Sequence, residues 1–143
     1  MNDEEKGTTA VPRVIPPVPD RDDQYFWTGV EEGRLLARRC ARCSRLQHPP
    51  SPMCPRCGSL DWENQELSGR GVVHSWIVSR HPAEPEGAGR IVALVALEEG
   101  RRLVSNLQGV APADVVNGMP VELTFAEIDG VRLPQFRPAG GRS

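Results

Sequence analysis

Hydrophobic and polar residues alternate in the C-terminal half of the chain, over short segments that turn residues separate. Five such segments are expected to be strands: 72–79, 91–97, 101–107, 121–125 and 131–136. One helical turn is expected at 112–117, before the fourth strand. This order is typical of a small closed barrel of the OB type, although another five-stranded meander is an alternative. We therefore predict a barrel over residues 67–138, followed by a tail at 139–143.

The turns of the expected barrel are marked by their residue types. Hairpin turns are predicted at 98–100 (Glu-Glu-Gly) and at 129–130 (Asp-Gly). Pro134 lies inside the last strand, and proline lacks a backbone N–H, so this strand should be an edge or carry a bulge. The segment 80–90 is expected to be the longest loop of the barrel.

The N-terminal part of the chain has a different pattern. Residues 1–19 are polar and then rich in proline, which predicts an extended leader or linker, with a disordered tail as the alternative. Residues 20–37 have an apolar stripe with helical spacing, and Asp20 or Asp22 is a suitable N-cap. Because glycines interrupt this stripe, two short helices are expected rather than one long helix. The predicted fold is thus mostly β, with short N-terminal helices.

Composition and charge exclude several classes of protein. The chain has 143 residues, and its 14 Gly and 14 Pro make a helical bundle a poor fit. A net charge of −2 disfavours a strongly basic nucleic-acid-binding protein. The longest strongly apolar run, 91–97, is far shorter than the ~20 residues of a membrane span. The first residues are acidic and polar, unlike a secretory signal, so we expect a cytoplasmic protein.

The four cysteines form the sharpest motif of the sequence. Cys40, Cys43, Cys54 and Cys57 make two C-x2-C pairs separated by ten residues. Two such turns can direct four thiolates at one tetrahedral metal ion, which predicts zinc, with iron in a rubredoxin-like site as the alternative metal. Two disulfides would suit a secreted domain, and a redox motif would need a single pair in a βαβ unit.

A site closed by four cysteines has no open position for water or substrate, so it is expected to be structural. It would hold a zinc ribbon over residues 38–66 that has little core of its own. Leu46, Met53 and Leu60 are the apolar residues expected to be buried there.

The segment 34–58 contains six arginines and neither Asp nor Glu. With four thiolates and one divalent ion, its net charge is near +4, while the rest of the chain is acidic. This charge favours an anionic partner surface or a phosphate-bearing ligand. The alternative is a general preference for arginine, because the chain has 17 basic residues and only Lys6 is a lysine.

Three adjacent aromatic residues, Tyr25, Phe26 and Trp27, make up nearly half of the aromatic residues of the chain. They are expected to anchor an interface with a partner or to pack against the chain's own ribbon, since Trp and Tyr dominate interface energetics.

Residues for catalysis are scarce. The sequence shows no phosphate-binding glycine loop, no dinucleotide fingerprint and no nucleophile elbow. His48 is expected on the ribbon surface, and His74 is expected in the core or at its rim because it alternates with Val72 and Trp76. We therefore assign no catalytic residue, and an enzyme that acts by itself is disfavoured.

The order of several segments resembles a known family. They are QYFWTGVEEGRL, CARC…CPRCGS, Trp62, SGRGVVHSW, IVALVALEEG, VNGMPVELTF and PQFRP. This order is similar, over residues 20–138, to the bacterial and archaeal proteins catalogued as domain of unknown function thirty-five. The resemblance implies N-terminal helices, a rubredoxin-like four-cysteine zinc ribbon and a C-terminal OB barrel. It also implies an accessory role beside thiolase-superfamily enzymes, with an acyl-CoA thioester as a ligand shared with the partner.

The proline-rich leader is similar to one branch of this family. In that branch the domain is tied to a MaoC-like enoyl-CoA hydratase and partners a thiolase-like aldolase of steroid side-chain degradation. Many members have Pro-Tyr just before the second barrel strand, where this chain has Gly89 and Arg90.

Two functions of different classes follow. The first is a non-catalytic subunit that stabilises a thiolase-like enzyme and frames its CoA site. Arg80, His81 and Arg90 would then lie near the CoA phosphates, which need positive charge. The second is a nucleic-acid-binding module, which would need stacking aromatics, and here only Trp76, Phe125 and Phe136 are available in the barrel. Eleven acids against eight arginines from Ser59 onward disfavour this second function.

Overall fold

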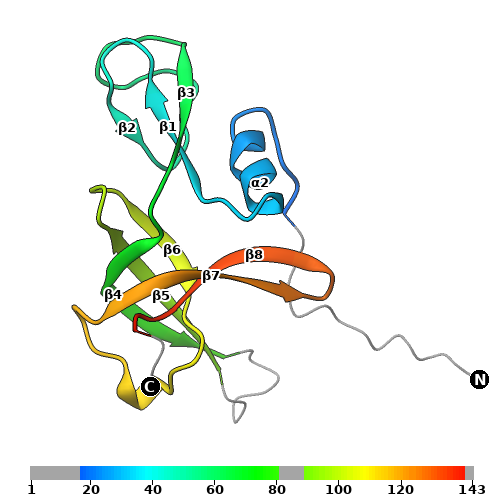
Figure 1. The fold of residues 1–143 in the computed structure, drawn as a ribbon, viewed down its shortest axis with the longest axis vertical. Coiled ribbons are helices and arrows are strands. Elements are labelled where there is room, and N and C mark those ends of the chain that lie inside the picture. The colour runs from blue at the N-terminus through cyan, green and yellow to red at the C-terminus, as the bar shows by residue number, and fades with distance from the viewer. Residues whose placement is uncertain (1–16, 81–88, 141–143) are drawn as a thin grey trace, which may run out of the picture.

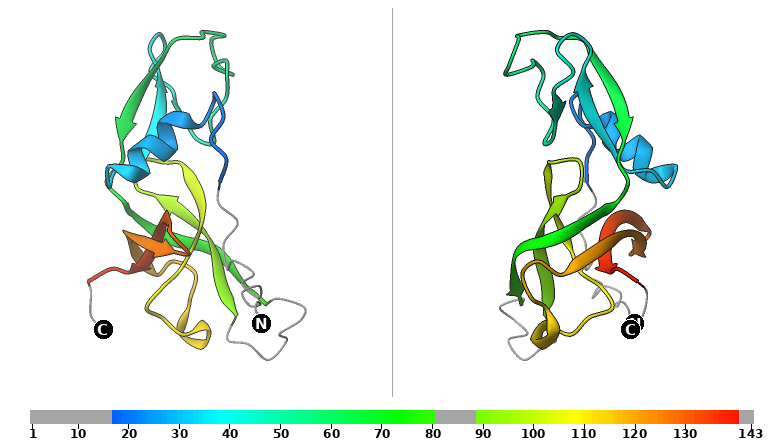
Figure 2. Two further views of the ribbon diagram at one scale, coloured as in Figure 1. Left: turned by 90° about the vertical axis from the view of Figure 1, so that its right-hand side faces the viewer. Right: turned by 60° about the vertical axis from the view of Figure 1, so that its left-hand side comes forward.

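The computed structural model describes residues 17–80 and 89–140 of the chain. Residues 1–16, residues 81–88, which include His81, and residues 141–143 lie outside the described part. In both figures the ribbon and the barrel occupy opposite ends of an elongated molecule, and the helix lies beside their junction (Figures 1 and 2).

Residues 20–37 contain one α-helix, α2 (Gln24–Glu31), so the prediction of two helices in this range is wrong. The chain leaves α2 at Gly33, whose φ of +76° suits glycine, and the N–H of Arg34 donates to Gly29 O. Residues from Leu36 onward then enter a strand, because Leu35, Leu36 and Ala37 are buried in the core. Before the helix, Asp20 accepts backbone hydrogen bonds from Asp22 and Asp23.

The ribbon is a three-stranded antiparallel sheet with the order β2-β1-β3. Its strands are β1 (Leu36–Cys40), β2 (Leu46–Gln47) and β3 (Trp62–Glu66). Of the expected ribbon core, Leu46 is half-buried, but Met53 is 52% exposed and Leu60 is 70% exposed. That prediction is wrong because the buried side chains lie at the base of β1, where the ribbon meets the helix.

The barrel is a five-stranded antiparallel sheet with the order β6-β5-β4-β7-β8, as predicted. Its strands are β4 (Arg70–Ser79), β5 (Arg90–Leu97), β6 (Arg102–Asn106), β7 (Pro120–Ile128) and β8 (Val131–Pro138). The expected helical turn is a 3-10 helix, η1 (Pro112–Asp114). A bridge between Leu107 and Phe136 nearly closes the barrel, and the Phe136 side chain is fully buried. Pro134 lies in β8, which is the last strand of this sheet.

A bulge in β4 changes which side chains face the core. Val73 pairs with Val95 and Ser75 pairs with Leu94, so His74 is the extra residue. Val73 is buried before the bulge and Trp76 is half-buried after it, while His74 is exposed. The simple alternation that would place His74 in the core therefore fails at this position.

One hydrophobic core joins the three parts of the molecule. Side chains of α2 and β1 contact the barrel core, and Leu67 lies between the two sheets. Within 17–80 and 89–140, no helix is long and apolar enough to span a bilayer.

Candidate metal centre and adjoining groove

The two C-x2-C turns have the same backbone design. In the first, the N–H of Ser44 donates to Cys40 O, and in the second the N–H of Gly58 donates to Cys54 O. Ser44 has a φ of 67° and Gly58 a φ of 79°, so each turn places a left-handed residue directly after its second cysteine. This repeated geometry directs all four side chains into the space between the turns.

The four sulfurs are close enough to share one ion. Cys40 Sγ lies 3.5 Å from Cys57 Sγ, and Cys43 Sγ lies 3.7 Å from Cys54 Sγ. All four lie within 4.8 Å of one another. Zn–S bonds of about 2.3 Å in a tetrahedron would separate the sulfurs by about 3.8 Å, so the arrangement fits zinc.

The electrostatics of the centre also favour a cation. The N–H groups of Cys43 and Arg42 donate to Cys40 Sγ and lower the pKa of Cys40 to about 6. The N–H of Ser59 lowers the pKa of Cys57, but burial and the three neighbouring sulfurs outweigh it and raise that pKa to about 11. Four thiolates at this distance repel one another, and a divalent ion removes that repulsion. The centre is thus suited to hold the ribbon together and has no position for a substrate.

Most ribbon arginines have partners inside the chain. Arg34 forms ion pairs with Glu66 and Glu32. Arg39 donates hydrogen bonds to Ser44 O and Gln65, and Arg45 donates to Gln47. The Arg38 guanidinium lies 4.2 Å from the centre of the Tyr25 ring. The guanidinium groups of Arg42 and Arg56 are exposed and contact no charged partner in the described part of the chain. Among the described residues of this segment only Arg34 is paired with carboxylates, so the segment keeps its basic charge, and Arg42 and Arg56 place two exposed cations at the tips of the metal-binding turns.

The three adjacent aromatic residues have different environments. Tyr25 and Phe26 are each only 8% exposed. The Phe26 ring stacks on His48 at a centroid distance of 5.7 Å, so the helix does pack against the chain's own ribbon. Trp27 is half-buried and meets the Phe26 ring edge-on at 4.9 Å. Trp27 is thus the member of this cluster that is most available to a partner.

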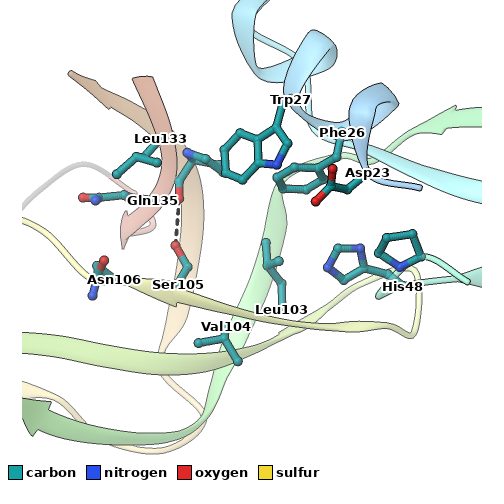
Figure 3. A pocket seen from close by; sticks show the side chains of 12 residues that line it. Asp23, Phe26, Trp27, His48, Leu103, Val104, Ser105, Asn106, Leu133 and Gln135 are labelled. Carbon is teal, nitrogen blue, oxygen red and sulfur yellow. Dashed lines mark hydrogen bonds between the residues drawn. The ribbon is translucent and has the colours of Figure 1, made fainter. Parts of the chain in front are cut away.

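A pocket of about 350 Å³ lies where the helix, the ribbon and the barrel meet (Figure 3). Phe26 and Trp27 lie on one side of it, and Leu103 and Val104 of β6 lie on the opposite side. Burial lowers the pKa of His48, which lines the pocket and is not the ribbon-surface residue that the sequence predicts.

A second hollow adjoins the first beside the β5–β6 hairpin. It is lined by His48, Pro49, Leu94, Gly100, Arg101, Arg102, Leu103 and Val104. No pattern in the sequence predicts this groove directly. Two features of the sequence could have indicated the groove. Val104 is an apolar residue at a position of β6 where the side chain points outward, and two adjacent arginines follow the hairpin turn.

The residues predicted to lie near CoA are at the other end of the barrel. Arg80 follows β4 and Arg90 begins β5, where it pairs with Ser79, so the two arginines lie on either side of residues 81–88. Both are exposed. The groove beside the hairpin lies at the opposite end of β5, across roughly 23 Å of extended strand.

The barrel aromatics offer a poor platform for nucleic-acid bases. Phe136 is fully buried, and Phe125 is half-buried with the Arg132 guanidinium 5.7 Å from its ring centre. Trp76 is half-buried. Base stacking needs exposed aromatic faces, so this geometry does not favour the nucleic-acid alternative.

Two family models match consecutive parts of the chain. Residues 27–63 match "ChsH2, rubredoxin-like zinc ribbon domain", and residues 64–126 match "ChsH2, C-terminal OB-fold domain". Their boundary falls within β3, close to the linker between the two sheets.

The relatives include hydratase subunits and scaffold proteins. The chain is 46% identical to a probable enoyl-CoA hydratase alpha subunit of Thermomonospora curvata, over 92% of this chain and 43% of the relative. It is 38% identical to the 3-oxo-4,17-pregnadiene-20-carboxyl-CoA hydratase alpha subunit of Mycobacterium tuberculosis, over 87% of this chain and 40% of that subunit. A DUF35 domain-containing scaffold protein of Pyrococcus furiosus is 36% identical, over 84% of this chain and 94% of the relative. The chain thus spans about two fifths of the two hydratase subunits.

Two solved structures are similar. The "Ltp2-ChsH2(DUF35) aldolase" contains a chain that is 47% identical, with a TM-score of 0.81, and the match covers 86% of this chain and 98% of that one. A DUF35-family protein of unknown function from Sulfolobus solfataricus has a TM-score of 0.55 at 18% identity, over 70% of this chain and 75% of that one. The second likeness concerns the fold alone.

Proposed function

This chain belongs to the DUF35 family of zinc-ribbon and OB-fold proteins, and on that premise we propose that it is a non-catalytic accessory subunit. It docks on a thiolase-superfamily enzyme that acts on acyl-CoA, stabilises that enzyme and frames its CoA site. The observation that carries this proposal is the likeness to the ChsH2(DUF35) chain of an aldolase, at 47% identity over 98% of that chain.

The chemistry of the described residues supports the same role. The metal centre is closed by four sulfurs, so it has no position for a reacting group. The core joins α2, the ribbon and the barrel into one body that can present a fixed surface to a partner. In this proposal the reacting groups belong to the partner enzyme.

Complex formation with the Ltp2 protein of the similar aldolase tests the docking. The two purified proteins are mixed, and size-exclusion chromatography with light scattering measures the mass of the product. We expect one hetero-oligomer with a fixed ratio of the two chains. Separate elution at micromolar concentrations would contradict the proposal. Zinc analysis of the same peak should give one ion per copy of this chain.

The substrate class is a finer part of the proposal. One relative is named a hydratase subunit for a pregnadiene carboxyl-CoA, which supports a steroid side-chain CoA thioester as the substrate of the partner. The hydratase names of two relatives also support an association with a MaoC-like enoyl-CoA hydratase. Turnover of the assembled enzyme on steroid and straight-chain acyl-CoA thioesters would test the substrate class.

The loop that Arg80 and Arg90 flank is proposed to approach the phosphates of CoA, and His81 belongs to the same proposal. A guanidinium stays charged at working pH, and one charge-assisted hydrogen bond contributes ~1.5–3 kcal/mol. Replacing Arg80 or Arg90 with alanine should therefore raise the KM of the assembled enzyme for the CoA thioester several-fold with little change in kcat.

The matched control is Arg56→Ala, which removes an exposed arginine at the far end of the molecule. Its KM should equal that of the unmodified complex. An unchanged KM in both loop variants, with the complex still assembled, would remove the loop from the CoA site.

A further inference from the structure

Two adjoining hollows form one groove at the junction of the helix, the ribbon and the barrel. We call it the junction groove and define it by its lining residues: Asp23, Phe26, Trp27, 48–50, Leu94, 100–106 and 133–135. The two hollows share His48, Leu103 and Val104, so a ligand in one would continue into the other. Val104 is 66% exposed on this shared wall.

The deeper hollow is mainly apolar, and several of its polar groups are bonded within the chain. Asp23 and His48 also line it, and one oxygen of the Asp23 carboxylate accepts from the N–H of Asp20 at 2.8 Å. Ser105 donates to Pro134 O at 2.9 Å, and Asn106 donates to Ile91 O at 3.2 Å. The amide oxygen of Gln135 accepts a hydrogen bond from Gln108. An occupant therefore meets mainly ring and aliphatic surface, including that of Trp27 (Figure 3). At about 350 Å³, the hollow is large enough to take a bulky apolar side chain.

The shallower hollow is cationic. Arg101 and Arg102 line it, and its lining includes neither Asp nor Glu. Their guanidinium groups form no ion pair or hydrogen bond in the described part of the chain. Other arginines of the barrel are paired, such as Arg70 with Glu98 at 2.7 Å. Two unpaired cations beside an apolar hollow complement a carboxylate next to an apolar side chain.

We propose that the junction groove receives a segment of the partner enzyme in which a bulky apolar side chain is flanked by a carboxylate. The apolar side chain fills the hollow between Trp27 and Leu103, and the carboxylate pairs with Arg101 or Arg102. This inference rests on the proposed function, because it takes the thiolase-like enzyme as the partner. Two adjoining open hollows suit an extended polypeptide better than a compact small molecule.

The groove also gives the metal centre a role in docking. His48 and its neighbouring prolines belong to the ribbon and form one wall, while Leu103 and Val104 belong to the barrel and form the other. The stack between Phe26 and His48 fixes the helix against that ribbon wall. The docking surface therefore requires a folded ribbon, and through it the metal.

A set of surface substitutions tests the groove, with the Ltp2 protein of the similar aldolase as the binding partner. Val104→Glu places a carboxylate on the shared wall, and we expect the Kd to rise more than tenfold. Arg102→Gln should raise the Kd a few-fold and Arg102→Glu more, because the second change reverses the charge. Raising the salt concentration should weaken binding of the unmodified chain more than that of Arg102→Glu.

The matched control is Val116→Glu, because Val116 is also an exposed valine, at 60%, and lies outside the groove. We expect its Kd to stay within twofold of that of the unmodified chain. Thermal unfolding and zinc content should be unchanged in all variants. Val104 and Arg102 are exposed, so their replacement leaves the core intact. The two variants Arg102→Gln and Arg102→Glu test the groove even if Val104→Glu does not fold.

Two negative outcomes are distinguishable. If the unmodified chain binds Ltp2 and the Val104 and Arg102 variants bind equally well, the groove is not the docking site, while the proposed function stands. If the unmodified chain does not bind at all, the proposed function fails and this inference fails with it.

Discussion

At the scale of single residues, the hydroxyl of Tyr25 is buried without a hydrogen bond to any residue that the structure describes. Burial raises the pKa of Tyr25 to about 12, although the Arg38 guanidinium acts against this. The Tyr25 ring makes favourable contacts, because it packs in the core and lies under the Arg38 guanidinium. The aromatic ring and not the hydroxyl should therefore contribute to stability.

Replacing Tyr25 with phenylalanine should leave the free energy of unfolding unchanged or raise it by about 1 kcal/mol, because a buried unpaired hydroxyl is costly. Replacing it with alanine should lower that free energy by about 3–5 kcal/mol, because the ring is lost. Denaturant unfolding of the two variants checks both values. A loss of more than 1 kcal/mol in Tyr25→Phe would mean that the hydroxyl has a partner.

At the scale of secondary-structure elements, α2 packs on β1 so closely that a side chain does not fit between them. A Cβ added to Gly29 would lie 2.8 Å from the Leu36 side chain and 3.1 Å from Arg34 O. Gly29 is itself buried on the core side of α2. The glycine therefore sets the distance between the helix and the first strand of the ribbon.

Gly29→Ala should lower the free energy of unfolding by about 1–3 kcal/mol, because overpacking outweighs the better helix propensity of alanine. The control is Thr28→Ala, one residue earlier on the exposed face of the helix, where we expect a change within about 0.5 kcal/mol. Equal unfolding midpoints for the two variants would contradict the packing argument.

The elements differ in how well the sequence predicts them. The five barrel strands and both hairpin turns are confirmed, because alternation and turn residues are local signals. The second helix and the position of His74 are wrong, because a glycine turn after α2 and a bulge in β4 override local periodicity. The buried positions of the ribbon are also wrong, since Met53 and Leu60 are exposed. Which ribbon side chains are buried depends on how the ribbon packs against the helix, and the spacing of residues does not reveal that packing.

In the candidate site, the sequence likewise predicts some features and misses others. The four cysteines are an explicit spacing signal, and the structure brings them together. The junction groove combines residues from α2, the ribbon loop, β6 and β8, which are far apart in the sequence. Only the tertiary fold brings Phe26 next to His48, so no local pattern of residues predicts the groove.

At the scale of the whole molecule, the metal is expected to stabilise both the ribbon and the surface beside it. Cys40→Ser removes one of four ligands, so zinc content should fall from one ion per chain to well below one. Structural zinc contributes on the order of 10 kcal/mol to the folding of small ribbons, so hydrogen exchange should lose protection over residues 36–66.

Cys57→Ser should behave in the same way, because all four sulfurs surround one point. Ser51→Ala is the control, since it changes an exposed-loop hydroxyl of the same ribbon and no ligand. If the proposed docking is correct, both cysteine variants should also lose affinity for Ltp2. A metal-free protein with a protected ribbon and normal partner binding would contradict the structural role of the metal.

We propose that this chain supports the chemistry of a partner enzyme and performs none alone. The most direct measurement is a titration of Ltp2 with this chain while aldolase turnover is followed. The predicted result is a rate that rises to a plateau at a fixed ratio of the two proteins, with no turnover by this chain by itself. Turnover by this chain alone, or a rate of Ltp2 that does not respond to it, would contradict the claim.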